Sequence, residues 1–228
     1  MERLAGAAFV DDIASLAIGY TQQRMTLEVI NDFAIKHQLE WGENKCKVME
    51  IGTHKEINKQ WDLGNKKIKT CHEYKYLGEI ISRDGKNTGN IKEREGKVKA
   101  KVIETITCAK NEIMQKIATR VLLKLHESVL IPSLFYAAET WSLSAVETKQ
   151  IDRIDLWALK RIFGLPPTTP TPAVRFMTGT LYASVRIQMM QLIYLHDLLQ
   201  KEDVHWANKS LDVLVENNAV GKTHNKNT

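Results

Sequence analysis

The chain has 228 residues, of which 43% are hydrophobic and 26% are charged, a balance typical of a globular protein and not of a disordered one. Its formal net charge is +5. No apolar run approaches the roughly 20 residues that a membrane span needs, and the first one stops at Asp11 and Asp12, so we expect neither a signal peptide nor a membrane contact. The cysteines are widely spaced and odd in number, which predicts a reducing, intracellular compartment, cytoplasmic or nuclear.

Short extended segments and one helix are predicted for the first third of the chain. Two apolar runs, 4–10 and 13–19, flank the pair Asp11-Asp12, and this pattern indicates a β-hairpin with an acidic two-residue turn. A helix is expected over 22–37, because its apolar residues recur at helical spacing. Its inward face would consist of Met25, Val29, Ile30, Phe33, Ala34 and His37. Further extended segments are expected at 39–41, 46–51, 57–63, 66–69 and 74–82.

From about residue 88 the pattern becomes helical. Ile91, Val98, Val102 and Ile106 trace one face of a long helix whose other face is rich in Lys and Glu. More helices are expected over 118–130, where Pro132 would end the helix, and over 134–141, 145–163, 181–199 and 204–216. The inward face of the segment 181–199 would carry Leu181, Val185, Met189, Leu192 and Leu199. The sequence therefore predicts an α+β chain, with strands first and helices afterwards.

Charge is also unevenly distributed. Residues 1–41 carry an excess of acidic side chains, whereas residues 42–120 carry an excess of basic ones. An acidic start followed by a basic middle is typical of a cation site beside a surface for polyanions. The alternative is a solvated, Lys-rich face, and the charge pattern alone favours that alternative.

The pair Asp11-Asp12 is the first candidate site. Two adjacent carboxylates at the end of a hairpin repel one another, so a nearby cation is favourable there. Mg²⁺ suits the position, because it takes oxygen ligands and commonly uses one or two carboxylates together with phosphate oxygens. The alternative is an ordinary Asp-rich turn. The dipeptide alone favours an ordinary turn, so the choice between a turn and a metal site depends on the neighbouring sequence motifs.

Four segments carry a family resemblance. Residues 8–13 (Ala-Phe-Val-Asp-Asp-Ile) resemble the aromatic-x-Asp-Asp box of reverse transcriptases, most of all the Phe-Ala-Asp-Asp form of non-LTR (LINE-type) retrotransposons. Residues 39–49 are similar to the Asn-x-x-Lys-like element that follows in this family, and 74–81 match its Tyr-Leu-Gly strand motif. Residues 134–141 resemble its Leu-Leu-Tyr-Gly-x-Glu-x-Trp stretch. The resemblance covers about residues 5–163.

The resemblance implies an RNA-directed DNA polymerase that performs two-metal nucleotidyl transfer on an RNA template and a DNA primer. It implies that Asp11 and Asp12 ligate catalytic Mg²⁺ and that Lys45 acts as general acid toward pyrophosphate, although Lys47 could take that place. The alternative, equally favoured, is that both lysines are simply the solvent-facing residues of a strand. Tyr76 and Gly78 would belong to the primer grip. Alternatively, Tyr76 and its neighbour Leu77 are simply core residues, the reading that we favour for Leu77.

The resemblance also implies a domain order. Residues 1–83 would be a partial palm with the Asp-Asp box, 88–165 a thumb-like helical region, and 166–228 a post-thumb helical extension with a polar tail. In the family, fingers and a first palm strand with another metal-binding Asp precede the box, whereas only ten residues precede Asp11 here. We therefore expect weak or absent Mg²⁺ binding and an inactive isolated chain, from a truncated element or a reading frame that starts at an internal Met.

Basic side chains after residue 88 form the candidate nucleic-acid surface. They would bind phosphates weakly and without sequence preference, as a thumb helix would. The set consists of Lys92, Arg94, Lys97, Lys99 and Lys101. Interleaved Glu residues leave the alternative that i,i+4 ion pairs account for this face. The rival hypothesis for the whole chain is a non-catalytic helical nucleic-acid-binding or scaffolding remnant, in which Asp11-Asp12 is only a turn.

The remaining patterns are less specific. The cysteines and histidines lack the spacing of a zinc site, and His126, His196 and His205 are expected to be packing or surface residues. The tryptophans are interpreted as core anchors, and an exposed one would become a candidate for base stacking. They are Trp41, Trp61, Trp141, Trp157 and Trp206.

Overall fold

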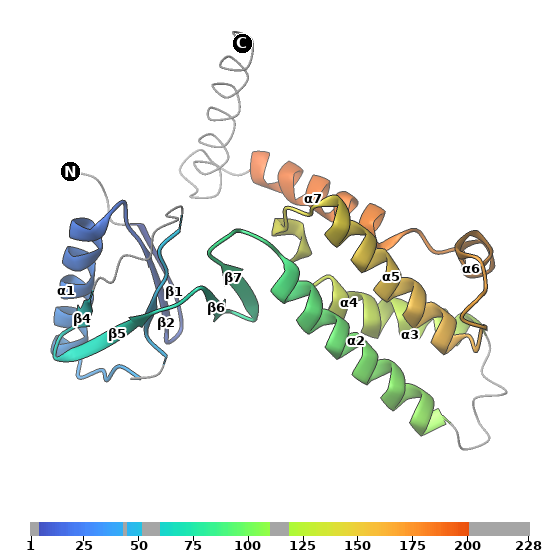
Figure 1. Cartoon of the computed structure of the whole chain (residues 1–228), viewed down its shortest axis with the longest axis horizontal. Helices are drawn as coiled ribbons and strands as arrows, with labels where there is room; N and C mark the ends of the chain where they lie inside the picture. The colour runs from blue at the N-terminus through green and yellow to red at the C-terminus, as the bar shows by residue number, and fades with distance from the viewer. Residues whose placement is uncertain (1–4, 43–44, 52–59, 110–118, 201–228) are drawn as a thin grey trace, which may run out of the picture. The chain divides into compact units, whose positions relative to one another are not determined.

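The fold is known from a computed structural model, which describes residues 5–42, 45–51, 60–109 and 119–200. The chain divides into two compact units, Met1–Lys86 and Asn87–Thr228 (Figure 1). Within the described residues, the strands belong to the first unit and the second unit is helical. The chain is therefore of mixed α/β composition with small, mostly antiparallel sheets, and the change from strands to helices falls at residue 86.

The first unit begins with the expected hairpin. Strands β1 (Ala5–Phe9) and β2 (Asp12–Leu16) pair antiparallel. Phe9 lies opposite Asp12, so the two turn residues are Val10 and Asp11. The expected turn was therefore wrong by one position. Asp12 pairs with Phe9 as the first residue of β2, so only Val10 and Asp11 remain to make the turn.

The two faces of this hairpin have different surroundings. Directly paired residues point to the same face of the hairpin. One face therefore carries Gly6, Ala8, Ile13 and Ser15, and the other carries Ala7, Phe9, Asp12, Ala14 and Leu16. On the first face, Gln23 Nε2 of helix α1 donates to Ser15 Oγ at 3.1 Å. On the second, Phe9 is 60% exposed and Leu16 is 67% exposed. Ala7 on this face is exposed as well, so the face is an open, mostly apolar surface within the described residues.

Helix α1 (Tyr20–Lys36) packs through a narrower stripe than expected. Leu27 and Ala34 are buried, whereas Met25, Val29 and Phe33 are each more than half exposed. The expected inward face was therefore wrong for these three residues and for His37, which is also exposed. The helix rests on a two-stranded hairpin and on the three-residue strand β4, and these short strands cover only one side of it.

A small mixed sheet completes the core of the first unit. Strands β3 (Lys47–Val48), β5 (Lys66–Thr70) and β4 (Trp61–Leu63) lie in that order, with β3 parallel and β4 antiparallel to β5. The buried side chains of this core are Leu27, Val48, Trp61 and Leu63. Gly64 and Asn65 form the turn between β4 and β5, and Gly64 has φ 62°, a conformation that favours glycine. A Cβ atom on Gly64 would also lie 2.6 Å from Oδ1 of Asn31 on α1, so that side chain would have to move.

A second hairpin follows where one strand was expected. Strands β6 (Glu73–Tyr76) and β7 (Glu79–Ser82) pair antiparallel. Their turn consists of Leu77 and Gly78, whose φ values are 47° and 84°, as a type I′ turn requires. Leu77 is 39% exposed, so its interpretation as a core residue was wrong.

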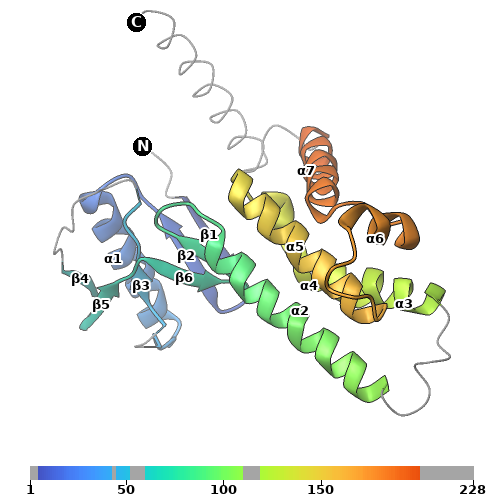
Figure 2. The same cartoon turned by 45° about the vertical axis from the view of Figure 1, so that its right-hand side comes forward.

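The second unit is organised by two long helices. Helices α2 (Thr88–Ala109) and α5 (Ala145–Ile162) run side by side in both views (Figures 1 and 2). They begin at the same end, where Oε1 of Glu147 accepts a hydrogen bond from the backbone N–H of Asn87 at 2.9 Å. The face expected for α2 is confirmed, since Ile91, Val98 and Val102 are at most 1% exposed.

The N-terminus of α5 is fixed by a capping box. Ser144 Oγ accepts from the N–H of Glu147 at 3.3 Å, and Glu147 Oε2 accepts from the N–H of Ser144 at 2.9 Å. The helix ends before Gly164, which has φ 62°. The expected start and end of this helix are therefore confirmed.

The segment before α5 differs from the expectation at Pro132. Helix α3 (Thr119–Leu125), a π-helical turn η2 (His126–Leu130) and α4 (Ile131–Leu134) form one continuous helical run. Pro132 lies in the first turn of α4, where a missing N–H is tolerated, so it does not end the run. The helix expected over 134–141 is replaced by a turn and the 3₁₀ segment η3 (Ala138–Thr140).

Helices α6 (Thr171–Thr178) and α7 (Ala183–Leu199) belong to the same unit as α2 and α5, while the helix expected over 204–216 lies outside the described residues. The inward face expected for α7 was wrong. Val185, Met189 and Leu192 are exposed, whereas Ile187 is fully buried. Polar anchors set this rotation, because Gln191 Nε2 donates to Trp141 O at 2.7 Å and Ser184 binds α5. None of the described helices has both the length and the apolar composition that crossing a membrane requires.

Candidate functional site

The acidic pair lies at the tip of the first hairpin. Asp11 is a turn residue, Asp12 is the first residue of β2, and both side chains are exposed. Val10, the last residue of the apolar run 4–10, lies in the same turn, has φ 55° and is 91% exposed, so it does not belong to the first strand. A β-branched residue in the left-handed region costs about 1–3 kcal/mol, and such strain is found disproportionately at functional sites.

Two other sequence motifs reach the surroundings of Asp12. Tyr74, from the Tyr-Leu-Gly segment, donates its hydroxyl to the carbonyl oxygen of Lys45 at 2.7 Å. Burial raises the pKa of Tyr74, and the negative charges of Asp12, Cys46 and Cys71 raise it further. The hydrogen bond joins the segments 39–49 and 74–81, and the effect on the pKa of Tyr74 places this residue within electrostatic range of Asp12.

The thiols beside this cluster are chemically quiet. Burial raises the pKa of Cys46 above its ordinary value, and Lys66 only partly offsets that effect. Burial likewise raises the pKa of Cys71, with Lys47 acting in the opposite sense. A thiol that stays protonated at neutral pH is neither a strong nucleophile nor a good metal ligand.

The carboxylates suit Mg²⁺ in donor type but fall short in number. Asp11 and Asp12 supply hard oxygen ligands, which Mg²⁺ prefers. Within the described residues, however, no group of three or more His, Cys, Asp or Glu side chains is placed to hold a metal ion. A two-metal centre needs more carboxylates than this pair. The residues present do not complete such a centre, and no catalytic step can be derived from them alone.

The other residues expected at the site have mixed positions. The side chain of Lys45 is exposed, and its backbone carbonyl is the group that Tyr74 binds. Tyr76 is half-buried at the end of β6, and Gly78 is the second turn residue of the β6–β7 hairpin. Contacts of these residues with pyrophosphate or a primer stay predictions.

The basic side chains of α2 do not form one surface. At 100° per residue, Lys92 and Lys99 share one flank of the helix, and Lys97 and Lys101 share nearly the opposite flank. The contacts agree: Lys99 Nζ lies 5.9 Å from the ring centre of Trp157 on α5, whereas Lys101 Nζ donates to Ser133 Oγ on α4. The expected continuous stripe is therefore split between two neighbours of the helix.

Ion pairs and burial change the basic set further. Lys97 pairs with Glu93 and Lys99 pairs with Glu95, each at 2.6 Å and at i,i+4 spacing. They are the ion pairs expected under the alternative hypothesis, in which i,i+4 pairing alone accounts for the charged face of α2. Arg94 is only 3% exposed and its guanidinium lies 4.8 Å from the ring centre of Tyr136. A buried guanidinium cannot contact phosphates on the surface, so Arg94 was wrongly included.

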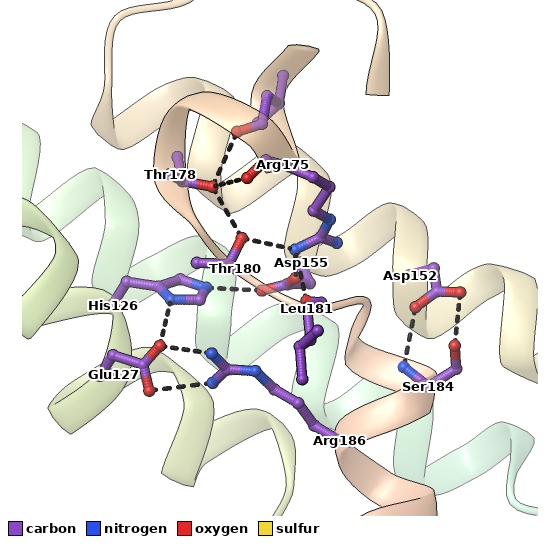
Figure 3. Close-up of polar contacts among 11 residues, drawn as sticks. His126, Glu127, Asp152, Asp155, Arg175, Thr178, Thr180, Leu181, Ser184 and Arg186 are labelled. Atoms are coloured by element: carbon purple, nitrogen blue, oxygen red, sulfur yellow. Dashed lines mark hydrogen bonds and ion pairs between the residues drawn. The ribbon is translucent and has the colours of Figure 1, made fainter. Parts of the chain in front are cut away.

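Sequence reasoning missed a buried polar cluster in the second unit (Figure 3). His126 Nε2 lies 2.6 Å from Asp155 Oδ1, and Arg175 donates to Asp155 Oδ2 at 2.7 Å. The same Arg175 nitrogen also donates to Thr180 Oγ1 and to the carbonyl of Leu181. Both His126 and Asp155 are 1% exposed, so a substrate cannot reach them, and the expectation of a packing role for His126 is confirmed.

This cluster ties η2, α5 and α6 to the loop that follows α6. Burial alone would raise the pKa of Asp155, but hydrogen bonds and charge from His126 and Arg175 hold it below its ordinary value. Nearby, Arg186 of α7 forms two hydrogen bonds with Glu127, at 3.0 and 2.5 Å. The available sequence signal was Asp155 itself, which lies among Ile151, Ile154 and Ala158 on the buried face of α5 and must be paired there.

Comparisons with known proteins identify no relative: no family model, no curated protein and no solved structure matches the chain.

Proposed function

We propose that the chain is part of an RNA-directed DNA polymerase of the non-LTR retrotransposon type. In this proposal the first unit supplies a partial palm, and the second unit supplies a thumb-like helical region that holds an RNA template and a DNA primer. Asp11 and Asp12 are the metal-binding pair, and Lys45 acts beside them. The compartment that fits this activity is cytoplasmic or nuclear.

One observation carries the proposal. Segments that resemble two of the family motifs are joined by the hydrogen bond from Tyr74 to the carbonyl of Lys45, and the charge of Asp12, in a third such segment, raises the pKa of Tyr74. The strained Val10 adds support, because backbone strain is more often kept at a working site than at an arbitrary turn.

The proposal does not extend to activity of the chain alone. The described residues provide two carboxylates where two-metal transfer needs several, so Mg²⁺ binds weakly and primer extension gives no product. A template-dependent product that disappears in Asp11→Ala would contradict this part of the proposal.

The direct test is localised metal binding. Mn²⁺ replaces Mg²⁺ at oxygen sites and broadens the NMR signals of nearby nuclei. At low Mn²⁺ concentrations the amides of Val10, Asp11, Asp12 and Tyr74 should broaden first, and Asp11→Asn with Asp12→Asn should abolish the effect. Asp62→Asn is the matched control, an exposed carboxylate on β4 of the same unit. Broadening that ignores the hairpin tip, or survives the double substitution, would favour the rival hypothesis of a non-catalytic nucleic-acid-binding or scaffolding remnant.

A further inference from the structure

The surface shared by α2 and α5 differs in charge from the opposite flank of α2. On α2, Lys92 and Lys99 lie on the flank toward α5. On α5, Arg153, Trp157 and Arg161 follow one another at four-residue spacing and so form one stripe. Arg161 lies with its guanidinium carbon 5.9 Å from the ring centre of Trp157, the same distance as Lys99 Nζ. Two cations from two helices therefore meet at one half-buried indole ring.

The net charge separates this flank of α2 from the opposite one. Toward α5 there are four positive side chains, Lys92, Lys99, Arg153 and Arg161, and one negative side chain, Glu95, which pairs with Lys99. On the opposite flank Lys97 and Lys101 share their surroundings with Glu93 and Glu104, so the charges cancel. A strand of phosphates is attracted to the first flank and not to the second.

The dimensions of this surface match a short stretch of nucleic acid. The helical rise separates Lys92 from Lys99 by about 10 Å and Arg153 from Arg161 by about 12 Å. A strand stacked as in a duplex carries a phosphate per roughly 3.4 Å along its axis, so it would place about four phosphates on this surface, and a more extended single strand would place fewer. The partly exposed ring of Trp157 offers a base an aromatic contact in the middle of the cationic rim.

We propose that single-stranded nucleic acid binds along the α2–α5 surface, through Lys92, Lys99, Arg153 and Arg161 to phosphates and through Trp157 to a base. This inference rests on the proposed function for its ligand class but uses residues of α5 that the motif resemblance does not assign. It also replaces the continuous stripe expected along α2, because Arg94 is buried and Lys97 and Lys101 point elsewhere. The binding is independent of sequence and sensitive to salt.

The test is binding of the full chain to a fluorescein-labelled oligo(dT), measured by anisotropy over a series of salt concentrations. The double variant Lys92→Ala/Arg153→Ala removes two exposed cations without touching the core. We expect affinity to fall roughly fivefold or more and the log–log salt slope to become shallower by about 1.4, since each phosphate contact on a single strand contributes about 0.7. Trp157→Phe, which keeps the packing, should weaken binding while leaving the slope unchanged.

The matched control is Lys97→Ala/Lys101→Ala, which removes the same charge from the opposite flank of α2. Affinity and slope should change by less than twofold in this control, and circular dichroism should show all variants folded. Equal losses in both double variants would overturn the inference, as would loss only in the control. The Mn²⁺ experiment separates the two proposals. If Mn²⁺ broadens the signals of Asp11 and Asp12 but Lys92→Ala/Arg153→Ala binds the oligonucleotide as the unchanged chain does, only the proposed binding surface is refuted. If this double variant loses binding but Mn²⁺ does not broaden the signals of Asp11 and Asp12, only the polymerase assignment is refuted.

Discussion

Val10 is the residue whose backbone conformation is least compatible with its side chain. It has φ 55° and is almost fully exposed, so its isopropyl group gains nothing from packing. Val10→Gly should therefore stabilise the hairpin by about 1 kcal/mol, because glycine adopts the left-handed region without strain. Urea unfolding followed through the NMR signals of residues 6–16 measures the change. The same substitution at Val146, which is exposed in the first turn of α5, should destabilise by several tenths of a kcal/mol. A destabilising effect at Val10 would show that its conformation is not strained.

Asp155 contributes to the acid stability of the second unit. Its pKa is lower in the folded chain than in the unfolded chain, so its contribution is fully present above the unfolded value near pH 4 and is lost as the pH falls through the folded value. Asp155→Asn should cost about 3–5 kcal/mol at pH 7, because it leaves Arg175 buried without its charged partner. Urea unfolding at several pH values should show a shallower acid dependence in the variant, and an unchanged dependence would contradict this role.

At the scale of elements, Glu147 joins the starts of two parallel helices. Its carboxylate accepts from the N–H groups of Asn87 and Ser144, where the positive ends of both helix dipoles meet. Burial would raise the pKa of Glu147, but these hydrogen bonds hold it below its ordinary value. Glu147→Ala should destabilise by about 2 kcal/mol and increase amide exchange in the first turns of both α2 and α5. Glu95→Ala, which removes an exposed i,i+4 partner, should change stability by less than about 0.5 kcal/mol. Fraying confined to α5 would contradict the joining role.

The elements also show what periodicity alone determines. The inward faces of α2 and the limits of α5 followed from the sequence, because each depends on apolar spacing or on caps within the element. The faces of α1 and α7 did not, because both helices are apolar around much of their circumference. Their rotation is set by partners distant in sequence, such as Ser15 for Gln23 and Trp141 for Gln191. The hairpin carrying Asp11 and Asp12 was predictable, whereas the approach of Tyr74 to it depends on tertiary packing that no local pattern encodes.

At the scale of the whole molecule, exposed apolar side chains occur in both units. They include Phe9 and Phe33 in the first unit and Phe176 and Leu192 in the second, each more than half exposed. Surfaces of this kind bind hydrophobic dyes and promote association. The purified chain should therefore enhance the fluorescence of such a dye, and Phe33→Lys with Leu192→Lys should reduce the signal without lowering stability by more than about 0.5 kcal/mol. A chain that stays monomeric and does not bind the dye would show that these faces are covered in solution.

The central claim is that Asp11 and Asp12 belong to an incomplete polymerase-type metal site. Such a site gains ligands when nucleic acid supplies phosphate oxygens, so primer–template should strengthen metal binding. The measurement is free Mn²⁺ by electron paramagnetic resonance, in the full chain with and without a primer–template, corrected for Mn²⁺ bound by the nucleic acid alone. The account predicts that Mn²⁺ binds at least about tenfold more tightly in the presence of primer–template, a gain of about 1.4 kcal/mol. The variant Asp11→Asn/Asp12→Asn should lose this gain, whereas the control Asp62→Asn should keep it. No gain, or an equal gain in the Asp11→Asn/Asp12→Asn variant, would contradict it.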